Sequence, residues 1–486
     1  MATAVLNAPQ SAQAQAAGYS DKRRKLALLV IATAFVLDLM DSTILNIALP
    51  TIQHSMQASF TALQWMAAGY TLTFAVLLIT GGRMGDVFGY KKLFMWGLVG
   101  FMASSFLTGI AWNTEVLIAA RLLQGATAAL MVPQVLSVVQ LLYEPEERVA
   151  INGLLGGLSA IATTVGPVVA GLLMKANIAH LGWRPIFLIN IPLGLVALLL
   201  GAKYLPAGKS EHAAKIDGVG TALVVAAIGL LIFPLMQGHG LGWPAWTFVM
   251  AAASVPVFML FAWWQRRLSK RGGSPLVIPA LFRHRSFNVG LILSLIVFGT
   301  MAGFALTFTL LLQAGYGFSP LHTILTGIFV TVGIMPAVAL LSKKIIPALG
   351  RWAITIGSVV AALGFGAIGY TVTHASGAVS TWQLAPLLAI MGAGFGMAFS
   401  PLLPYVLSKV NPQDAGSASG VANAVQQIGG ALGVALVGIV FFGNLVSTKA
   451  YAQGFGRGIM LEVGLLLLCA VLSFFLPRHI VARSDS

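Results

Sequence analysis

Charged side chains are scarce in this sequence of 486 residues: Asp, Glu, Lys and Arg make up 8% of it, whereas hydrophobic residues make up 58%. Soluble globular domains contain roughly 25% charged residues. The mean hydropathy of +0.90 agrees with this shortage. The composition therefore excludes a soluble globular protein and predicts a chain that crosses a membrane many times.

Cysteine is almost absent as well, because Cys469 is the single one and lies in an apolar run. Disulfides within one chain and thiolate metal clusters are thereby excluded. The sequence also lacks the Gly-x-x-x-x-Gly-Lys-Ser/Thr motif of nucleotide-binding loops. Apart from one 22-residue loop, no interior segment between apolar runs is long enough for a soluble domain. We therefore expect no cofactor and no metal, and we rank a membrane-bound enzyme or sensor far below a transporter.

Fourteen apolar segments are long enough to cross a bilayer, which takes about 20 residues. None alternates with the period of two that is typical of outer-membrane barrels, so an all-α membrane protein is predicted. The predicted spans are 26–50, 62–82, 91–112, 115–141, 149–175, 185–204, 217–237, 245–264, 287–313, 319–342, 351–373, 381–408, 415–444 and 456–476.

The basic residues support this count. A net charge of +15 could indicate nucleic-acid binding, but the basic residues cluster in short loops between the apolar runs. With fourteen spans, most of the 28 Lys and Arg residues face the cytoplasm, as the positive-inside rule requires. Those placed outside are Lys175, Arg184, Lys449 and Arg457. We expect no nucleic acid as partner, and a multi-pass protein of the cytoplasmic (inner) membrane with both termini in the cytoplasm.

The longest interior connection divides the chain. It covers about 265–286 and is basic. Residues 1–20 lack the apolar stretch of a signal peptide and are expected to form a disordered tail. The predicted organisation is a cytoplasmic tail at 1–25, a six-helix bundle at 26–204, two extra helices and a linker at 205–286, a second six-helix bundle at 287–476 and a tail at 477–486.

Two carboxylates interrupt the first span, and a carboxylate in hydrocarbon costs roughly 2.5–3.5 kcal/mol or more. Asp38 and Asp41 are three residues apart and share roughly one helix face. They indicate a protein that moves protons or recognises cations. Two close carboxylates resist double ionisation, which favours holding one proton. The alternative for Asp38 is a structural hydrogen bond to a neighbouring helix.

Arg121 is the one Lys or Arg residue that lies more than two residues inside a predicted span. At 1.5 Å per residue it lies roughly 10 Å below the outer surface, and Asp41 reaches a similar level from the cytoplasmic side. The two can therefore pair. The alternative is an arginine that extends to the outer interface.

Three segments together resemble the major facilitator superfamily. Residues 82–92 (GRMGDVFGYKK) resemble its loop signature between spans 2 and 3, and residues 121–129 (RLLQGATAA) its span-4 signature. Residues 162–171 (ATTVGPVVAG) resemble its antiporter signature, which exporters carry. Taken alone, Pro167 and Gly166 predict only an ordinary helix bend. Tyr90 stands where the family usually has arginine, so one charge of the loop is missing.

Further segments resemble the fourteen-span drug:proton antiporter subfamily. They are 41–50 (DSTILNIALP), 183–192 (WRPIFLINIP), 415–423 (AGSASGVAN) and 426–430 (QQIGG). The resemblance implies the major facilitator fold, with fourteen spans arranged as 6+2+6. It implies an antiporter, driven by the proton gradient, that exports drugs or other small amphiphilic compounds by alternating access. A proton-coupled transporter of one metabolite on the same fold is the alternative.

The resemblance and the buried acids name the candidate residues. For proton coupling and substrate they are Asp38, Asp41, Asn46, Arg121 and Gln124; for a conformational latch Gly82, Gly85, Asp86, Gly89 and Lys91; for the antiporter signature Gly166, Pro167 and Gly171. The expected partners are a small-molecule substrate, protons and the lipid bilayer. We expect a monomer, with or without accessory export proteins.

Two groups of residues receive weaker roles. Glu462 in the last span and Glu115 are expected to be structural or interfacial. Aromatic residues recur at helical spacing in three spans, where packing is the commoner role and contact with an aromatic substrate the alternative. These are Trp65 and Tyr70, Phe304 and Phe308, and Phe395 and Phe399.

Overall fold

The structure is a computed structural model of the chain. It describes residues 19–210, 215–341, 348–375, 377, 379–411, 414–443 and 448–478, and within these ranges it contains helices and no strand. Several predicted segments lie partly outside the described residues: 1–18 of the predicted tail 1–25, the end of the predicted span 319–342 and 479–486 of the predicted tail 477–486.

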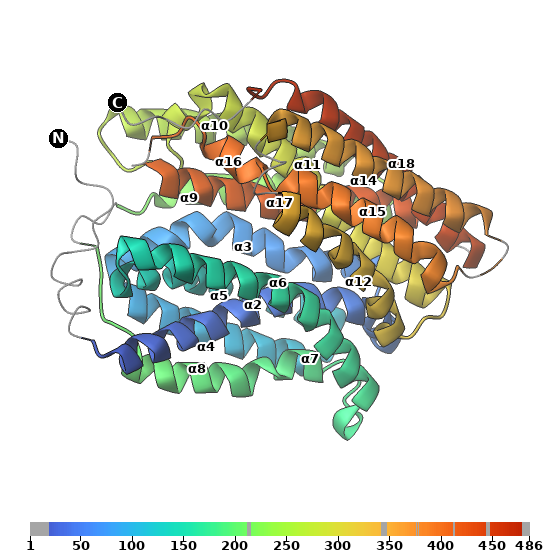
Figure 1. Ribbon diagram of the computed structural model, residues 1–486, viewed down its shortest axis with the longest axis horizontal. Coiled ribbons are helices and arrows are strands. Elements are labelled where there is room, and N and C mark those ends of the chain that lie inside the picture. Colours follow the sequence, from blue (N-terminus) through green and yellow to red (C-terminus); the bar gives the residue numbers. More distant parts are fainter. Residues whose placement is uncertain are drawn as a thin grey trace. The chain divides into compact units, whose positions relative to one another are not determined.

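The helices group by contact into two compact units. The first comprises residues up to 58 together with 69–226 and 257–276. Its helices are α2 (Asp21–Met56), most of α3 (Phe60–Phe88), α4 (Tyr90–Gly109), α5 (Thr114–Leu142), α6 (Pro145–Ala176), α7 (Pro185–Leu188) and α8 (Asn190–Tyr204). Within this unit α2 packs against α5, α6 and α8, and α4 packs against α5 and α8 (Figure 1).

The second unit comprises 59–68, 227–256 and the residues from 277 onward. Its helices are α11 (Arg285–Leu310), α12 (Pro320–Pro336), α14 (Arg351–His374), α15 (Thr381–Phe399), α16 (Leu402–Leu407), α17 (Ala415–Phe442) and α18 (Thr448–Ser473). Here α11 packs on α17 and α18, and α14 packs on α15 and α18. Helices α9 (Gly218–Gly240) and α10 (Ala245–Lys270) each contribute to both units. The predicted domain boundaries at 204 and 286 stay a prediction.

Local sequence sets several of the helix ends. Asn113 precedes α5, and its side chain accepts a hydrogen bond from the backbone N–H of Val116 at 2.9 Å. Glu144 and Glu147 form a capping box at the start of α6. Such caps satisfy backbone N–H groups that have no partner within the helix.

Thirteen helices of the described residues are long and apolar enough to cross a membrane. The predicted span 91–112 corresponds to α4, which is not among them. It is 20 residues long and carries Lys91 and Lys92 in its first turn. The structure therefore confirms an all-helical membrane protein but does not confirm the count of fourteen.

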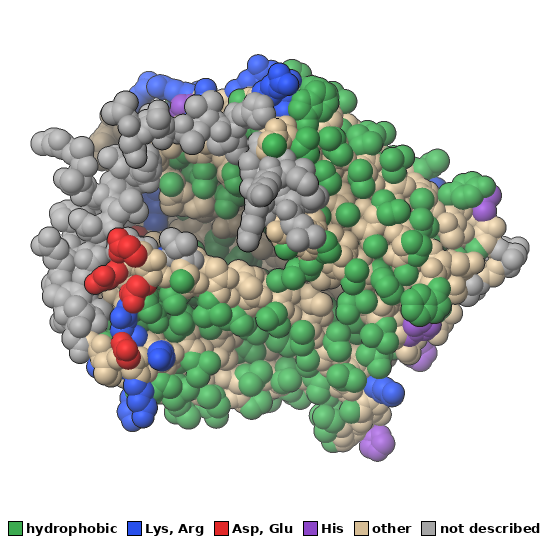
Figure 2. Space-filling view, in the orientation of Figure 1, with side chains coloured by type: hydrophobic (Ala, Val, Ile, Leu, Met, Phe, Trp, Pro, Cys, Tyr) green, Lys and Arg blue, Asp and Glu red, His purple; other side chains and the backbone are tan. Residues whose placement is uncertain are grey.

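Apolar side chains also cover the outside of these helices (Figure 2). On α10 only 11% of the most apolar stretch is buried, and Val249 and Met259 are 66% and 65% exposed. In water such a surface would be unfavourable, whereas in a bilayer it faces hydrocarbon. The informative side chains are therefore the polar ones that are buried.

Candidate functional site

Two buried charges form an ion pair between α2 and α5. Arg121 Nη1 donates to Asp41 Oδ2, and the two side chains are 1% and 0% exposed. The pairing predicted from their depth is confirmed, and Arg121 does not extend to the interface. Burying two charges is costly unless their geometry is good and further hydrogen bonds satisfy them.

Two neutral carboxamide side chains supply those further hydrogen bonds. Gln124 Nε2 and Asn190 Nδ2 donate to Asp41 Oδ1 at 2.8 and 2.9 Å. Both also donate to Ser105 Oγ, at 2.8 and 3.2 Å. Gln124 Oε1 in turn accepts from Arg121 Nη1 at 2.7 Å. The network therefore joins four helices, since Ser105 lies on α4 and Asn190 begins α8.

The second acid of α2 has a partner of its own. Tyr70 on α3 donates its hydroxyl to Asp38 Oδ1. The Tyr70 ring lies under the Arg121 guanidinium, whose Cζ is 4.6 Å from the ring centroid. A cation over an aromatic face is attracted by the ring. Asp38 and Asp41 therefore have separate donors, and Tyr70 connects them because it bonds to Asp38 and contacts the partner of Asp41. The structural hydrogen bond that was the alternative for Asp38 is thus found.

The hydrogen-bond directions define the charge of this site. Every recorded partner of Asp41 donates to it: one guanidinium and two carboxamides. An ionised carboxylate only accepts, whereas a protonated one has to donate. The arrangement therefore fits an anionic Asp41 beside a cationic Arg121. Protonation of Asp41 would remove the charge that holds Arg121 in place.

The residues of the antiporter signature pack against α2 beside this site. A Cβ atom on Gly166 of α6 would lie 3.3 Å from Met40 Cα and 3.2 Å from Thr43 Oγ1. Those two residues flank Asp41 on α2. Pro167 lies within α6, and Gly171 is buried on the same helix. Glycine at 166 therefore permits the close approach of the two helices.

The predicted loop 82–92 is mostly helical, because only Gly89 lies between the end of α3 and the start of α4. Side chains of these two helix ends hold the connection in place. Asp86 Oδ1 accepts a hydrogen bond from the Tyr90 hydroxyl at 3.0 Å. Gly89 has φ +99°, which favours glycine. Lys91 Nζ donates to the carbonyl of Ala202 at 2.7 Å. A side chain at Gly85 would overlap the carboxamide of Gln134 on α5.

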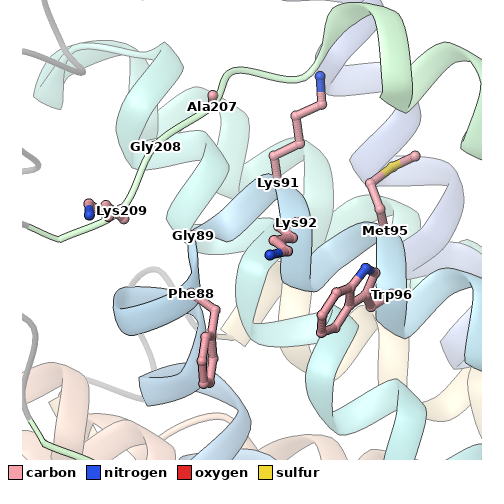
Figure 3. Close-up of a pocket in the computed structure, with 9 residues that line it drawn as sticks. All are labelled: Phe88, Gly89, Lys91, Lys92, Met95, Trp96, Ala207, Gly208 and Lys209. Atoms are coloured by element: carbon pink, nitrogen blue, oxygen red, sulfur yellow. The ribbon is translucent and has the colours of Figure 1, made fainter.

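The same loop lies beside a cavity of about 540 Å³. Figure 3 shows three lysines around it, Lys91, Lys92 and Lys209, together with Phe88 and Trp96. No carboxylate is among the nine described residues that line it. This cavity is therefore separate from the acids of α2.

Arg83, near the end of α3, holds the chain that follows α10. Its guanidinium donates to the carbonyl oxygens of residues 274–276, at 2.7 Å to Ser274 and 3.3 Å to Leu276. The end of α3 is therefore connected by hydrogen bonds to the predicted linker.

Asp217, one residue before α9, fixes the same segment. It accepts from Gln265 Nε2 at 2.7 Å, Trp264 Nε1 at 2.9 Å, the Gly220 N–H at 2.8 Å and the Leu276 N–H at 3.4 Å. Burial raises the pKa of the Asp217 carboxyl, but these hydrogen bonds outweigh it and hold that pKa below its ordinary value.

Sequence reasoning missed three members of the Asp41 network: Ser105, Asn190 and the linking Tyr70. Asn190 and Ser105 were detectable as polar residues within apolar runs, but their place in the Asp41 network depends on how four helices pack.

Asn46 was predicted for this site, but it is half-buried and takes no part in the hydrogen-bond network around Asp41. Gly82 lies on α3, where a Cβ would be 3.6 Å from Pro133 Cβ.

The weaker predictions had mixed outcomes. Glu115 is exposed in the first turn of α5, as expected of an interfacial residue. Glu462 is 0% exposed inside the second unit, which contradicts the interfacial alternative for it and leaves the structural one. Phe304 and Phe308 stack at 4.9 Å within the buried core of that unit, which fits the packing role.

Comparison with known proteins shows which family the chain resembles. The family model of the Major Facilitator Superfamily matches residues 31–434. The chain is 41% identical over 429 residues to the "Probable actinorhodin transporter" of Streptomyces coelicolor, covering 87% of this chain and 74% of that protein. It is 32% identical to the "Puromycin resistance protein pur8" of Streptomyces alboniger, over 94% and 92% of the two chains.

A third relative is the "Tetracenomycin C resistance and export protein" of Streptomyces glaucescens, 30% identical over 85% of this chain and 75% of that protein. These relatives are named for antibiotic resistance, export and transport, and none is named as an enzyme. Because the family model and the relatives extend along most of its length, the chain belongs to the major facilitator superfamily and is a membrane transporter of small molecules.

Proposed function

We propose that this transporter is a proton-coupled antiporter that exports drugs or other small amphiphilic compounds by alternating access. One observation carries the coupling: Asp41, a fully buried carboxylate of α2, is paired with a fixed guanidinium and accepts two further hydrogen bonds. An ionisable residue within a membrane span is a candidate for a functional site.

The proposed cycle uses protonation of that pair. A proton from the outer side forms an O–H bond with the Asp41 carboxylate, whose attraction for Arg121 is then lost. The guanidinium separates, the helices that the pair holds together rearrange, and substrate leaves to the outside. In the return step the O–H bond breaks, the proton enters the cytoplasm and the ion pair forms again. The proton gradient supplies the energy, and no cofactor takes part.

The orientation follows from the charge distribution of the sequence. We place the chain in the cytoplasmic membrane, with both termini and the α3–α4 loop in the cytoplasm. The antiporter signature at Gly166 packs directly against the α2 residues that flank Asp41. The site is complete within one chain, which supports a monomer as the functional unit.

The relatives guide the choice of substrates to test. An efflux-deficient bacterial host that expresses the chain should be profiled with actinorhodin, puromycin and tetracenomycin C, the compounds in the relatives' names. The compound with the largest gain in resistance is then loaded into vesicles that contain purified protein. Efflux is measured with and without a pH gradient.

The decisive variant is Asp41→Asn, which keeps an acceptor oxygen for Arg121 but cannot carry a proton. Asp21→Asn is the matched control, because it makes the same change at the exposed start of the same helix. We expect Asp41→Asn to lose gradient-driven efflux and Asp21→Asn to retain it. Asp41→Glu keeps an acid and should restore part of the gradient dependence. Normal gradient-driven efflux in Asp41→Asn would show that Asp41 is not the coupling residue.

A transporter dedicated to one metabolite is the second candidate. It is favoured by the identity of 41% with the "Probable actinorhodin transporter", compared with 32% for the puromycin resistance protein. Resistance to a single compound of the panel would favour this candidate, whereas resistance to several unrelated compounds would favour the multidrug exporter.

A further inference from the structure

A second buried acid lies in the other unit, far along the chain from Asp41. Glu462 is on α18 and is 0% exposed. Among the described residues, neither of its carboxyl oxygens has a hydrogen-bond partner. The neighbours on the same face of α18 are apolar, since Ile459 and Leu466 are 3% and 0% exposed. The proposed function makes no use of this side chain.

The neighbouring helices leave room for the Glu462 carboxyl at a glycine. A Cβ atom on Gly303 of α11 would lie 3.1 Å from Glu462 Oε1 and 2.9 Å from Val437 Cβ of α17. The carboxyl therefore occupies the space where a side chain at 303 would stand. Three helices enclose it, because α18 packs against both α11 and α17.

Among the side chains that the structure describes, no charged group of the packed helices faces this carboxyl. Residues 415–442 of α17 contain no ionisable side chain. Arg285 is the first residue of α11, and Arg351 of α14 donates to the carbonyls of Phe474 and Leu476. The other ionisable side chains that the structure describes on α14 and α18 are exposed, half-buried or displaced along the helix: Tyr370, His374, Tyr451, Arg457 and Cys469.

The surroundings of Glu462 are therefore the opposite of those of Asp41. A carboxylate without a cation or hydrogen-bond donor in a low-dielectric interior costs far more than a neutral carboxylic acid. The Asp41 site offers one guanidinium and two amide donors. The Glu462 site offers none, so the group that it can accommodate is the acid with its proton bound.

The Glu462 carboxyl also lies beside a contact that glycines make close. On α11, a Cβ on Gly299 would be 3.0 Å from the carbonyl oxygen of Gly429 on α17, and a Cβ on Gly433 would overlap the Gly299 carbonyl. Gly303 follows Gly299 by one helical turn. Small residues let helix backbones approach closely in lipid. A rearrangement of α18 relative to this contact would change the access of water to Glu462.

We propose that Glu462 is a second proton-binding site of the transporter, in addition to Asp41. Its carboxyl carries a proton while α11, α17 and α18 enclose it as in this structure. When the helices rearrange during the cycle, the O–H bond breaks, the proton passes to water and the hydrated carboxylate remains until a new proton binds. This inference rests on the proposed function, because it adds an acid to the same proton-driven cycle.

The test measures proton exchange directly and needs no substrate. The purified full-length chain in lipid vesicles is exchanged between acidic and alkaline buffer, and infrared difference spectra record the carboxylic C=O stretching bands of the acids that titrate. We expect one band to disappear in Glu462→Gln and to shift in Glu462→Asp. The band should be unchanged in Glu115→Gln, the same change at an exposed acid, and in Asp41→Asn.

The outcomes separate this inference from the proposed function. If Glu462→Gln gives the same difference spectrum as the wild type, the inference is overturned, whatever Asp41→Asn does to export. Normal gradient-driven export by Asp41→Asn would overturn the coupling role of Asp41 while a Glu462-dependent band still stood. If Glu462→Gln does not fold, Glu462→Asp, which retains an acid, decides by the presence or absence of the shift.

Discussion

The ion pair between Asp41 and Arg121 leads to a quantitative prediction about stability. Removing one partner of a buried pair costs about 3–5 kcal/mol, because the other charge remains buried without compensation. The two single variants Asp41→Asn and Arg121→Gln are therefore each expected to be destabilised. In the double variant neither charge remains, so the loss should be much smaller than the sum.

The structure also predicts which of the two single variants loses more stability. Without Arg121, Asp41 still accepts from Gln124 and Asn190, at 2.8 and 2.9 Å, and it can be neutralised by a proton. Without the Asp41 carboxylate, the Arg121 guanidinium keeps Gln124 Oε1 at 2.7 Å and the Tyr70 ring, and it cannot lose its charge. Asp41→Asn should therefore approach the upper part of the range and Arg121→Gln the lower part.

The measurement is a double-mutant cycle on purified protein in detergent micelles, with unfolding followed by tryptophan fluorescence against increasing denaturant. We expect a coupling energy of about 2–3 kcal/mol between the two positions. Asp21→Asn should unfold like the wild type, since Asp21 is exposed. Additive losses in the double variant would mean that the pair contributes little and that the reasoning about buried charge is incorrect.

Three further predictions concern the surroundings of this pair. Asp38→Asn keeps an acceptor for the Tyr70 hydroxyl, so the variant should fold. It removes a negative charge, so export of cationic compounds should be lost while neutral ones still leave. Equal loss of both classes in a transport assay would indicate a role in coupling or folding instead. Gly166→Leu inserts a branched side chain where a Cβ would already lie 3.3 Å from Met40 Cα. Export should fall while membrane insertion survives, with added proton leak, and wild-type efflux in the same vesicles would make the signature match incidental. Asp217→Asn should be less stable than the wild type at neutral pH. Because the folded pKa of Asp217 is held below its ordinary value, its contribution is present above about pH 3.9 and is lost as the pH falls through the folded pKa. Thermal unfolding in a series of buffers should show the difference between the two proteins shrinking in acid, and a constant difference would contradict this.

Much of the site could be predicted from single residues. A carboxylate and a guanidinium within apolar spans are so costly that Asp41 and Arg121 had to find partners, and the helical rise placed them at similar depths. The superfamily could be predicted for a similar reason, because its signatures are short, local patterns of Gly, Pro and charged residues.

The remaining contacts needed the packed helices. Ser105, Asn190 and Tyr70 are common residue types, and only the packing of α3, α4 and α8 around α2 and α5 brings them to the acids. The position of Glu462 in the last span left a structural or an interfacial role open, and the tertiary structure buries the residue opposite Gly303.

What the sequence determined by itself is thus the class of protein and its costly charges, because hydropathy and charge are properties of each residue. What only the tertiary structure decided is which neighbours those charges have, because hydrogen bonds act over about 3 Å and join positions such as 41 and 190 that lie far apart along the chain.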